Sequence, residues 1–189
     1  MQRTHKRISI SALLLCGLLP LSAQASNLLV NNNISHQEVL DAQQAWGEAL
    51  IKISQTYEQK GHAEAKKLAQ QVLDQAYGYQ QGAVLFKPTL ASGDQTFRTK
   101  ADGALSYFVG SDKQYPQDSG FALKGWKEYS FDNAAVYING DVALTMGHVK
   151  LIDNKGKQTV VDKSWAFKKD EQGQLRIVLH HSSLPFQPY

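Results

Sequence analysis

Residues 126–182 read WKEYSFDNAAVYINGDVALTMGHVKLIDNKGKQTVVDKSWAFKKDEQGQLRIVLHHS. Runs rich in β-branched and aromatic residues alternate there with short polar segments, which is typical of strands joined by turns. The predicted strands are 126–131, 134–138, 142–152, 158–167 and 175–182. The connections at Gly140 and Gly156 have the Asn, Asp and Gly composition of hairpin turns. Because hairpins join antiparallel neighbours, this half of the chain predicts an antiparallel meander.

The chain before the meander has helical periodicity. Ser35 and Glu38 form a capping-box pattern at the start of a predicted helix that ends near Gly61. The other elements predicted here are a helix at 62–77, a short strand at 83–86 and a short helix at 100–109. Helices followed by strands indicate an α+β fold, with the helices packed on one face of a curved antiparallel sheet.

The first 25 residues have the features of a secretory signal peptide. A basic start at Arg3, Lys6 and Arg7 precedes an apolar run over 8–21. The sequence Ala-Gln-Ala at 23–25 then supplies a small-x-small cleavage site. The apolar run is short for a membrane span. We therefore expect cleavage after Ala25 and a periplasmic or secreted protein that has no membrane segment.

Removal of residues 1–25 changes both the cysteine content and the net charge of the protein. The only cysteine, Cys16, leaves with this segment, which excludes thiolate nucleophiles, cysteine zinc sites and disulfides in the mature chain. The remaining 17 Lys and Arg balance 17 Asp and Glu, so charge gives no reason to expect nucleic acid or an anionic membrane as a partner. The rest is predicted to be a flexible lead-in, 26–34, and one domain, 35–189.

The residues His180 and His181 close the last predicted strand and are the most suggestive candidates for chemistry. Strand parity places His181 on the apolar face and His180 on the opposite one. The residues that define the apolar face are Leu175, Ile177 and Leu179. His181 is then either a hydrogen-bonded core residue or a ligand contact. Because adjacent strand residues diverge, the pair is a poor chelate, and we predict no metal site and no cofactor.

Several other residues allow both a structural and a functional interpretation. Arg98 is either an exposed loop residue or a pocket guanidinium that binds an anionic or carbonyl group. Lys127 and Lys163 are either solvated strand residues or additional positive charge in a pocket. The aromatic residues expected in the core or in a pocket wall are Trp46, Tyr107 and Trp165.

The order of these segments resembles a known family. The resemblance rests on Trp46 and on the segments AVLFKPT at 83–89, FRT at 97–99, YF at 107–108 and LHHSSLP at 179–185. They are similar to bacterial relatives of the calcium/calmodulin-dependent protein kinase II association domain, in the nuclear transport factor 2-like superfamily. The resemblance implies a cone-shaped fold, a deep pocket between the helices and the concave sheet, pocket arginines matched here by Arg98, and assembly through the sheet.

We accordingly predict an exported, non-catalytic protein that binds a small ligand or serves oligomeric assembly. The predicted ligand is small and polar or carries a carboxylate. The ligand-binding residues expected are Arg98, Tyr107, His181, Trp46 and Trp165. The alternative is an isomerase- or dehydratase-like enzyme in which His181 is the general base. Whether the protein is an enzyme stays open, although the lack of a recognisable pocket carboxylate favours the binding protein.

The strand at 142–152 predicts self-association. Its two faces are both largely apolar, whereas a strand with one wet face alternates apolar and polar residues. Helices can cover only one of these faces. We therefore expect a homodimer or larger oligomer that buries the outer face of the sheet. The alternative is a monomer whose long polar loop, 110–120, folds over that face.

Export is testable by intact-mass measurement on protein recovered from the periplasm or the medium. Cleavage after Ala25 gives a chain that starts at Ser26. The same chain expressed without residues 2–25 is the intracellular control, and its mass is the reference. An exported chain that retains Met1 contradicts the prediction.

Overall fold

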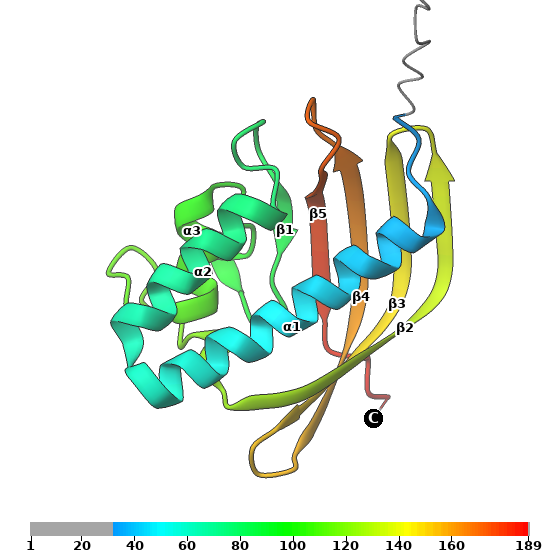
Figure 1. The fold of residues 1–189 in the computed structure, drawn as a ribbon. Helices are drawn as coiled ribbons and strands as arrows, with labels where there is room; N and C mark the ends of the chain where they lie inside the picture. The colour runs from blue at the N-terminus through cyan, green and yellow to red at the C-terminus, as the bar shows by residue number, and fades with distance from the viewer. Residues whose placement is uncertain (1–31, 189) are drawn as a thin grey trace, which may run out of the picture. The chain divides into compact units, whose positions relative to one another are not determined.

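Residues 32–188 are described by a computed structural model, in which three α-helices pack on one face of a curved five-stranded sheet (Figure 1). The elements are α1 (His36–Lys60), α2 (His62–Ala76), β1 (Leu85–Lys87), α3 (Ala101–Val109), β2 (Trp126–Asn139), β3 (Val142–Asp153), β4 (Gln158–Lys169) and β5 (Leu175–Ser183), with 3-10 turns at Gly93–Gln95 and Phe121–Leu123. The predicted α+β fold, with helices on a curved sheet, is confirmed. No helix in the described part of the chain is long and apolar enough to cross a membrane.

The sheet is mixed rather than purely antiparallel. Its strand order is β1-β5-β4-β3-β2, and β1 runs parallel to β5 with Leu85 opposite Leu179. Hairpin turns could not predict the pairing of β1 with β5, because most of the domain lies between these two strands. The predicted segments 126–131 and 134–138 form one strand, β2, whose register shifts between Asn133 and Ala135. A bulge therefore absorbs the polar break that the sequence shows there.

The start of α1 agrees with its capping-box pattern. The Ser35 hydroxyl accepts a hydrogen bond from the Glu38 amide at 3.2 Å, and the Glu38 carboxylate accepts one from the Ser35 amide at 2.7 Å. Ile34, the last residue of the expected lead-in, is buried, and its amide donates to the Gly140 carbonyl at 2.8 Å. The predicted signal peptide and residues 26–31 lie outside the described residues.

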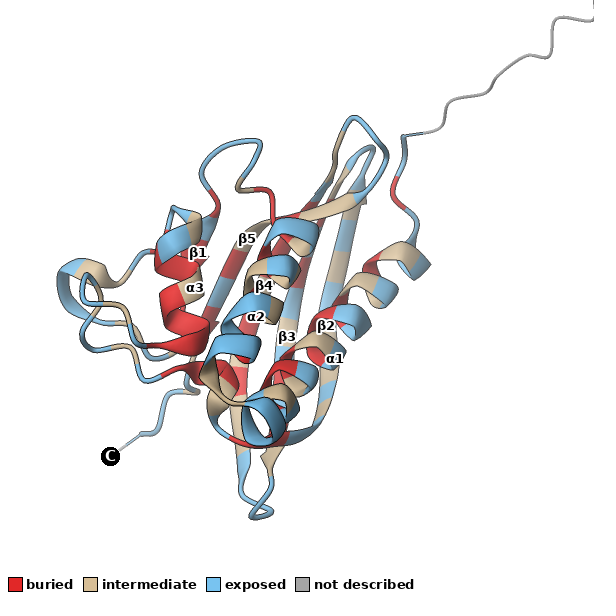
Figure 2. Cartoon of the chain, turned by 60° about the vertical axis from the view of Figure 1, so that its left-hand side comes forward, coloured by how far each residue is buried: buried red, intermediate tan, exposed pale blue. Residues whose placement is uncertain are grey.

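The core lies between the three helices and the concave face of the sheet, and α3 is buried along much of its length (Figure 2). Trp46, Leu50 and Ile53 of α1 belong to it. From β3 it takes Val149 and Leu151, which lie on the same face of the strand. The outer face of the sheet instead exposes large apolar side chains. These are Tyr137, Leu144 and Met146.

The parity prediction for the last strand is wrong because β5 contains a bulge. Ala166 of β4 pairs with Leu179, but the next residue, Phe167, pairs with Ile177. Val178 is thus an extra residue, and one extra residue moves every later side chain to the other face. His180 and Ser182 are consequently buried, and His181 is exposed on the outer face.

Gly147 in β3 is predicted to tolerate no side chain. A Cβ there would lie 2.0 Å from the Asp132 backbone oxygen, so the β2 backbone would have to move. Gly147→Ala should lower the free energy of unfolding by about 1–3 kcal/mol in chemical denaturation. Lys150→Ala, at an exposed position of the same strand, is the control and should change it by less than about 0.5 kcal/mol. Equal stabilities for the two variants would contradict the close approach.

Candidate active site

His180 is the centre of a buried polar cluster on the inner face of the sheet. Strand pairing places Lys163 opposite Ser182 and Trp165 opposite His180, so all four side chains point the same way. The His180 Nδ1 atom lies 2.7 Å from the hydroxyl of Tyr77, and its Nε2 atom contacts Lys163 Nζ. Lys163 Nζ also donates to Ser182 Oγ at 2.8 Å. A lysine is therefore held inside the core by an imidazole and a hydroxyl.

Aromatic rings enclose this cluster. The Lys163 amino group lies over the Trp46 ring at 4.3 Å and over the Trp165 ring at 4.9 Å. Trp46 Nε1 donates to the Tyr77 hydroxyl at 2.9 Å, and the His180 ring packs 4.4 Å from the Phe86 ring. These rings exclude water and fix the side chains in place.

The environment favours the neutral forms of Lys163 and His180. Burial lowers the pKa of Lys163 well below its usual range. Burial also lowers the pKa of His180, and the neighbouring Lys163 and His181 act in the same direction. Deprotonated lysine and histidine side chains can accept a proton during a reaction, as a general base must.

A small cavity adjoins the cluster. It holds about 10 Å³, which is room for about one water molecule. Its walls are formed by Trp46, Thr89, Tyr107, Phe108, Phe121, Leu151, Val161, Lys163, His180 and Ser182. No Asp or Glu belongs to this lining, so an anion there meets only basic and neutral groups.

Tyr107 lines this cavity, and its hydroxyl is buried. This hydroxyl makes no hydrogen bond of ordinary geometry among the described residues, although interactions with Thr89 and Leu90 oppose the effect of burial on its pKa. Burial raises the pKa of Tyr107, so the hydroxyl keeps its proton and is a donor. Because a buried unpaired hydroxyl is costly, this group is suited to bind a ligand oxygen.

Arg98 is buried but is fully engaged by the protein. Its guanidinium forms a two-pronged ion pair with Asp118 at 2.7 and 2.9 Å and donates to the backbone oxygens of Gln95 and Gly103. It also stacks 4.4 Å from the Tyr115 ring. The structure therefore places Arg98 in a structural ion pair rather than beside the cluster.

The other predicted site residues divide between the two faces of the sheet. Tyr107 and Trp46 line the cavity, and Trp165 packs against the Lys163 amino group. His181 is exposed on the outer face. Ligand contact by these residues stays a prediction. The side chain of Lys127 is 68% exposed, which agrees with the interpretation of Lys127 as a solvated strand residue.

The sequence interpretation missed Lys163, His180 and Ser182 as one group. A signal for Lys163 was present, since it shares strand parity with Val161 and Trp165, both apolar and buried. The signal for His180 was hidden by the bulge at Val178. Tyr77 was only the last residue of the predicted helix at 62–77, because nothing in the sequence shows that its hydroxyl reaches a strand about 100 residues later.

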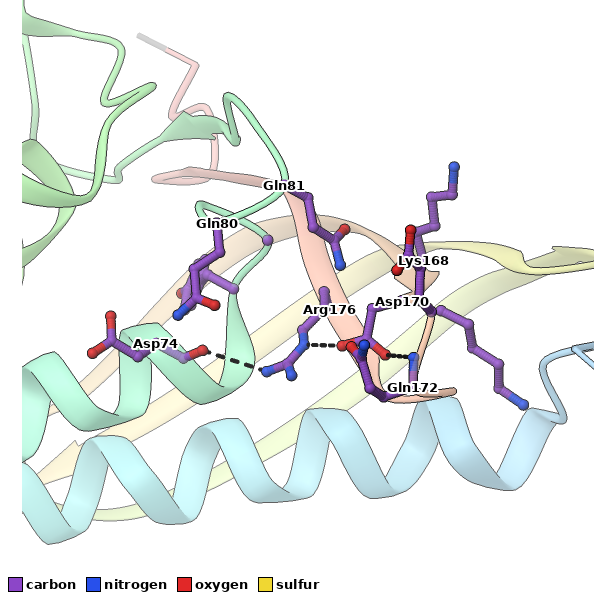
Figure 3. Close-up of a pocket in the computed structure, with 11 residues that line it drawn as sticks. Asp74, Gln80, Gln81, Lys168, Asp170, Gln172 and Arg176 are labelled. Atoms are coloured by element: carbon purple, nitrogen blue, oxygen red, sulfur yellow. Dashed lines mark hydrogen bonds and ion pairs between the residues drawn. The ribbon is translucent and has the colours of Figure 1, made fainter.

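A larger hollow of about 560 Å³ lies between the end of α2 and the β4–β5 hairpin, and Figure 3 shows its lining. Its principal charges are matched to each other. Arg176 pairs with Asp170 at 2.7 Å and also donates to the Asp74 and Gln75 carbonyls at the end of α2. This arrangement joins the hairpin to the helix and presents no unpaired buried group. Across residues 32–188, no three His, Cys, Asp or Glu side chains gather as a metal-binding group.

Comparison with known proteins identifies the family. The family model for metal-independent carbonic anhydrase matches residues 37–184. The chain belongs to the metal-independent carbonic anhydrase family. A metal-independent carbonic anhydrase from Nostoc sp. is 58% identical to it over 159 residues, which cover 84% of this chain and 78% of that protein.

Solved structures agree with this membership. An iota-carbonic anhydrase from a cyanobacterium, crystallised with bicarbonate, matches with a TM-score of 0.85 and 56% identity over 86% of this chain and 99% of that one. A calcium/calmodulin-dependent protein kinase II association-domain protein from Xanthomonas campestris matches with a TM-score of 0.53 and 20% identity over 80% and 89% of the two chains. The second match shows the shared fold alone, so the resemblance in the sequence was correct for the fold and too broad for the family.

Membership in the metal-independent carbonic anhydrase family overturns the prediction of a non-catalytic binding or assembly protein, because this is a family of enzymes. The family also replaces the isomerase or dehydratase alternative. The prediction failed because it took the missing pocket carboxylate as evidence against catalysis. The buried cluster offers nitrogen bases in place of a carboxylate.

The Arg98–Asp118 pair should be essential for stability. The two side chains are only 2% and 4% exposed, so Asp118→Ala leaves an uncompensated buried charge. We expect the free energy of unfolding to fall by about 3–5 kcal/mol in urea denaturation. Asp94→Ala, at an exposed turn, serves as the control and should be nearly neutral. A small loss for Asp118→Ala would contradict the structural role of the pair.

Proposed function

We propose that this chain catalyses the reversible hydration of carbon dioxide to bicarbonate at the cavity beside Lys163 and His180, whose walls must move apart to admit bicarbonate because about 10 Å³ holds a single water molecule. Family membership supports the reaction, as does the similarity to a carbonic anhydrase crystallised with bicarbonate. The observation that carries the proposal is local. A buried lysine–histidine pair stands next to the unpaired hydroxyl of Tyr107, in a cavity whose lining has no carboxylate.

The chemistry needs a base and donors for an anion. A water oxygen forms a bond to the carbon of CO2 and one C=O π bond becomes a C–O bond. The attacking water gives up one proton, which leaves bicarbonate. The Lys163–His180 pair is the base, because burial lowers the pKa of both groups. The proton passes to this pair and then to solvent, which restores the starting state.

The product oxygen atoms find donors on two sides of the cavity. Tyr107 presents its hydroxyl from α3 and Ser182 presents its hydroxyl from β5. Fixed donors of this kind stabilise negative charge as it develops in a water-poor site. Thr89 lines the same cavity, and in this proposal its hydroxyl orients the attacking water. A proton held on the basic pair beside the new anion adds Coulombic stabilisation.

Export and self-association belong to the same proposal. The basic start, the apolar run and the Ala-Gln-Ala site support secretion to the periplasm or medium. Exposed Tyr137, Leu144 and Met146 on the outer face support a homodimer that buries this face. Such a contact does not involve the cavity, whose lining residues lie on the inner side of the sheet.

Replacement of the buried amine tests the function. Lys163→Met keeps the length and the aromatic contacts of the side chain but removes the base. The turnover number for CO2 hydration, followed by stopped-flow with a pH indicator, should fall at least about 100-fold. Lys168→Met, exposed at the end of the same strand, should retain wild-type activity.

Circular dichroism on both variants separates loss of chemistry from loss of folding. The wild-type protein should keep its activity after dialysis against EDTA. Full activity of the Lys163→Met variant would contradict the assignment of the base. A wild-type protein without hydration activity would contradict the proposed function.

A further inference from the structure

Four contacts link the α1 helix to the proposed cavity in one continuous chain. Trp46 donates to Tyr77, Tyr77 contacts His180, His180 contacts Lys163, and Lys163 donates to Ser182. Four of these residues lie at or below 4% exposure, and Trp46 is 6% exposed. Water therefore has little access to this series of contacts, except through the small cavity that Lys163, His180 and Ser182 line.

The direction of these hydrogen bonds is set by Trp46, the first residue of the series. An indole N–H can only donate, so the Tyr77 oxygen accepts from Trp46. A phenol has two favourable in-plane positions at its oxygen, one for its own hydrogen and one for an incoming donor. The structure gives the Tyr77 hydroxyl two partners, Trp46 and His180. With Trp46 in one position, the Tyr77 hydrogen lies in the other and points at His180 Nδ1.

The protonation states of the next two residues follow from this direction. A His180 ring that accepts at Nδ1 carries its own hydrogen on Nε2. The Nε2 hydrogen faces Lys163 Nζ, which lies closer than Ser182 Oγ at 3.4 Å. An ammonium group has no lone pair and could not accept it, so Lys163 is a neutral amine. Its N–H groups then donate to Ser182, and the Ser182 hydrogen is left for the cavity.

We propose that Trp46 and Tyr77 are positioning residues, which hold His180 in the Nε2–H tautomer and thereby hold Lys163 as a neutral amine. Their role in hydration rests on the proposed function, whereas the tautomer itself does not. Tyr77 is absent from the cavity lining, and Trp46, which does line the cavity, acts here through its indole N–H and not through the reacting atoms. They act through the imidazole, as the outer partner of a catalytic histidine does.

The same geometry explains how the pair would release a proton after taking one up. One hydrogen lies between Lys163 Nζ and His180 Nε2 in any state that keeps their contact. With one further proton on the pair, every such state places a hydrogen on His180 Nδ1. That hydrogen competes with the Tyr77 hydrogen for the same 2.7 Å contact. The Tyr77 hydroxyl would then be buried without an acceptor, so the protonated pair is disfavoured.

Few other titratable groups face the pair. Tyr79 and Tyr107 lie near Tyr77 and act on its ionisation, and His181 follows His180 on the opposite face of the sheet. The cavity lining adds no Asp or Glu. The Tyr77 hydroxyl is thus the neighbouring group whose removal most directly changes the proton affinity of the pair.

The tautomer is tested directly by nitrogen-15 NMR of the full mature chain. In the wild-type protein near neutral pH, His180 Nε2 should carry the hydrogen and Nδ1 should have the shift of an unprotonated nitrogen. The assignment comes from a His180→Gln sample, in which these signals disappear. A hydrogen on Nδ1 in the wild-type protein overturns the proposal, and this result needs no enzymatic activity.

The contribution of Tyr77 is tested with Tyr77→Phe, which removes the hydroxyl and keeps the ring. The protonated pair then no longer leaves a tyrosine hydroxyl unpaired, so its pKa rises. Since the base must be unprotonated to act, the acidic limb of the pH–rate profile should move to higher pH by about one to two units. The NMR titration of His180 should move in the same direction.

Tyr79→Phe is the matched control. It removes a tyrosine hydroxyl that donates to the Arg98 carbonyl at 2.9 Å, from a ring stacked on Tyr77. It should leave the pH profile and the His180 tautomer unchanged, even if it lowers the melting temperature. An unmoved profile in Tyr77→Phe, or an equal shift in Tyr79→Phe, overturns the proposal. If the wild-type protein lacks hydration activity, the NMR comparison still decides the tautomer.

Discussion

A lysine amino group buried against an imidazole and two indole rings is the constraint on which this structure depends. Lys163 lies on the inner face of the sheet, where an isolated charge would be very costly. The surrounding residues meet this constraint in two ways. They provide hydrogen-bond partners in His180 and Ser182, and they provide ring faces in Trp46 and Trp165. The long α1 helix across the sheet is what brings Trp46 to this point.

The cluster exists because of an irregularity in the sheet. With regular pairing along β5, the residues that follow Ile177 would present His181 inward and His180 outward. The extra residue at Val178 reverses this order, so that His180 and Ser182 stand beside Lys163. The bulge therefore selects which of two adjacent histidines can take part in chemistry. Bulges often re-aim side chains next to functional sites, and this one aims both an imidazole and a hydroxyl.

The second buried basic residue, Arg98, shows what distinguishes a structural from a chemical role in this fold. Arg98 has a carboxylate partner and donates to two backbone carbonyls, so its charge is compensated within the protein. Lys163 has neither, and it contacts groups that can themselves gain or lose a proton. The first arrangement fastens the loop before α3 to the segment around Asp118. The second can change its protonation state in the course of a reaction.

The sequence by itself determined the elements of this protein. Local signals, such as the capping box at Ser35 and the turns at Gly140 and Gly156, depend on neighbouring residues, and they placed the helices and the hairpins correctly. Similarity along the segments near residues 83–108 and 179–185 indicated the fold. Only the tertiary structure decided the site. A bulge depends on the pairing of two strands, and the contact between Tyr77 and His180 joins residues 103 positions apart. The pairing of Arg98 with Asp118 likewise depends on the tertiary structure, because the sequence alone does not show which acceptor lies beside a guanidinium.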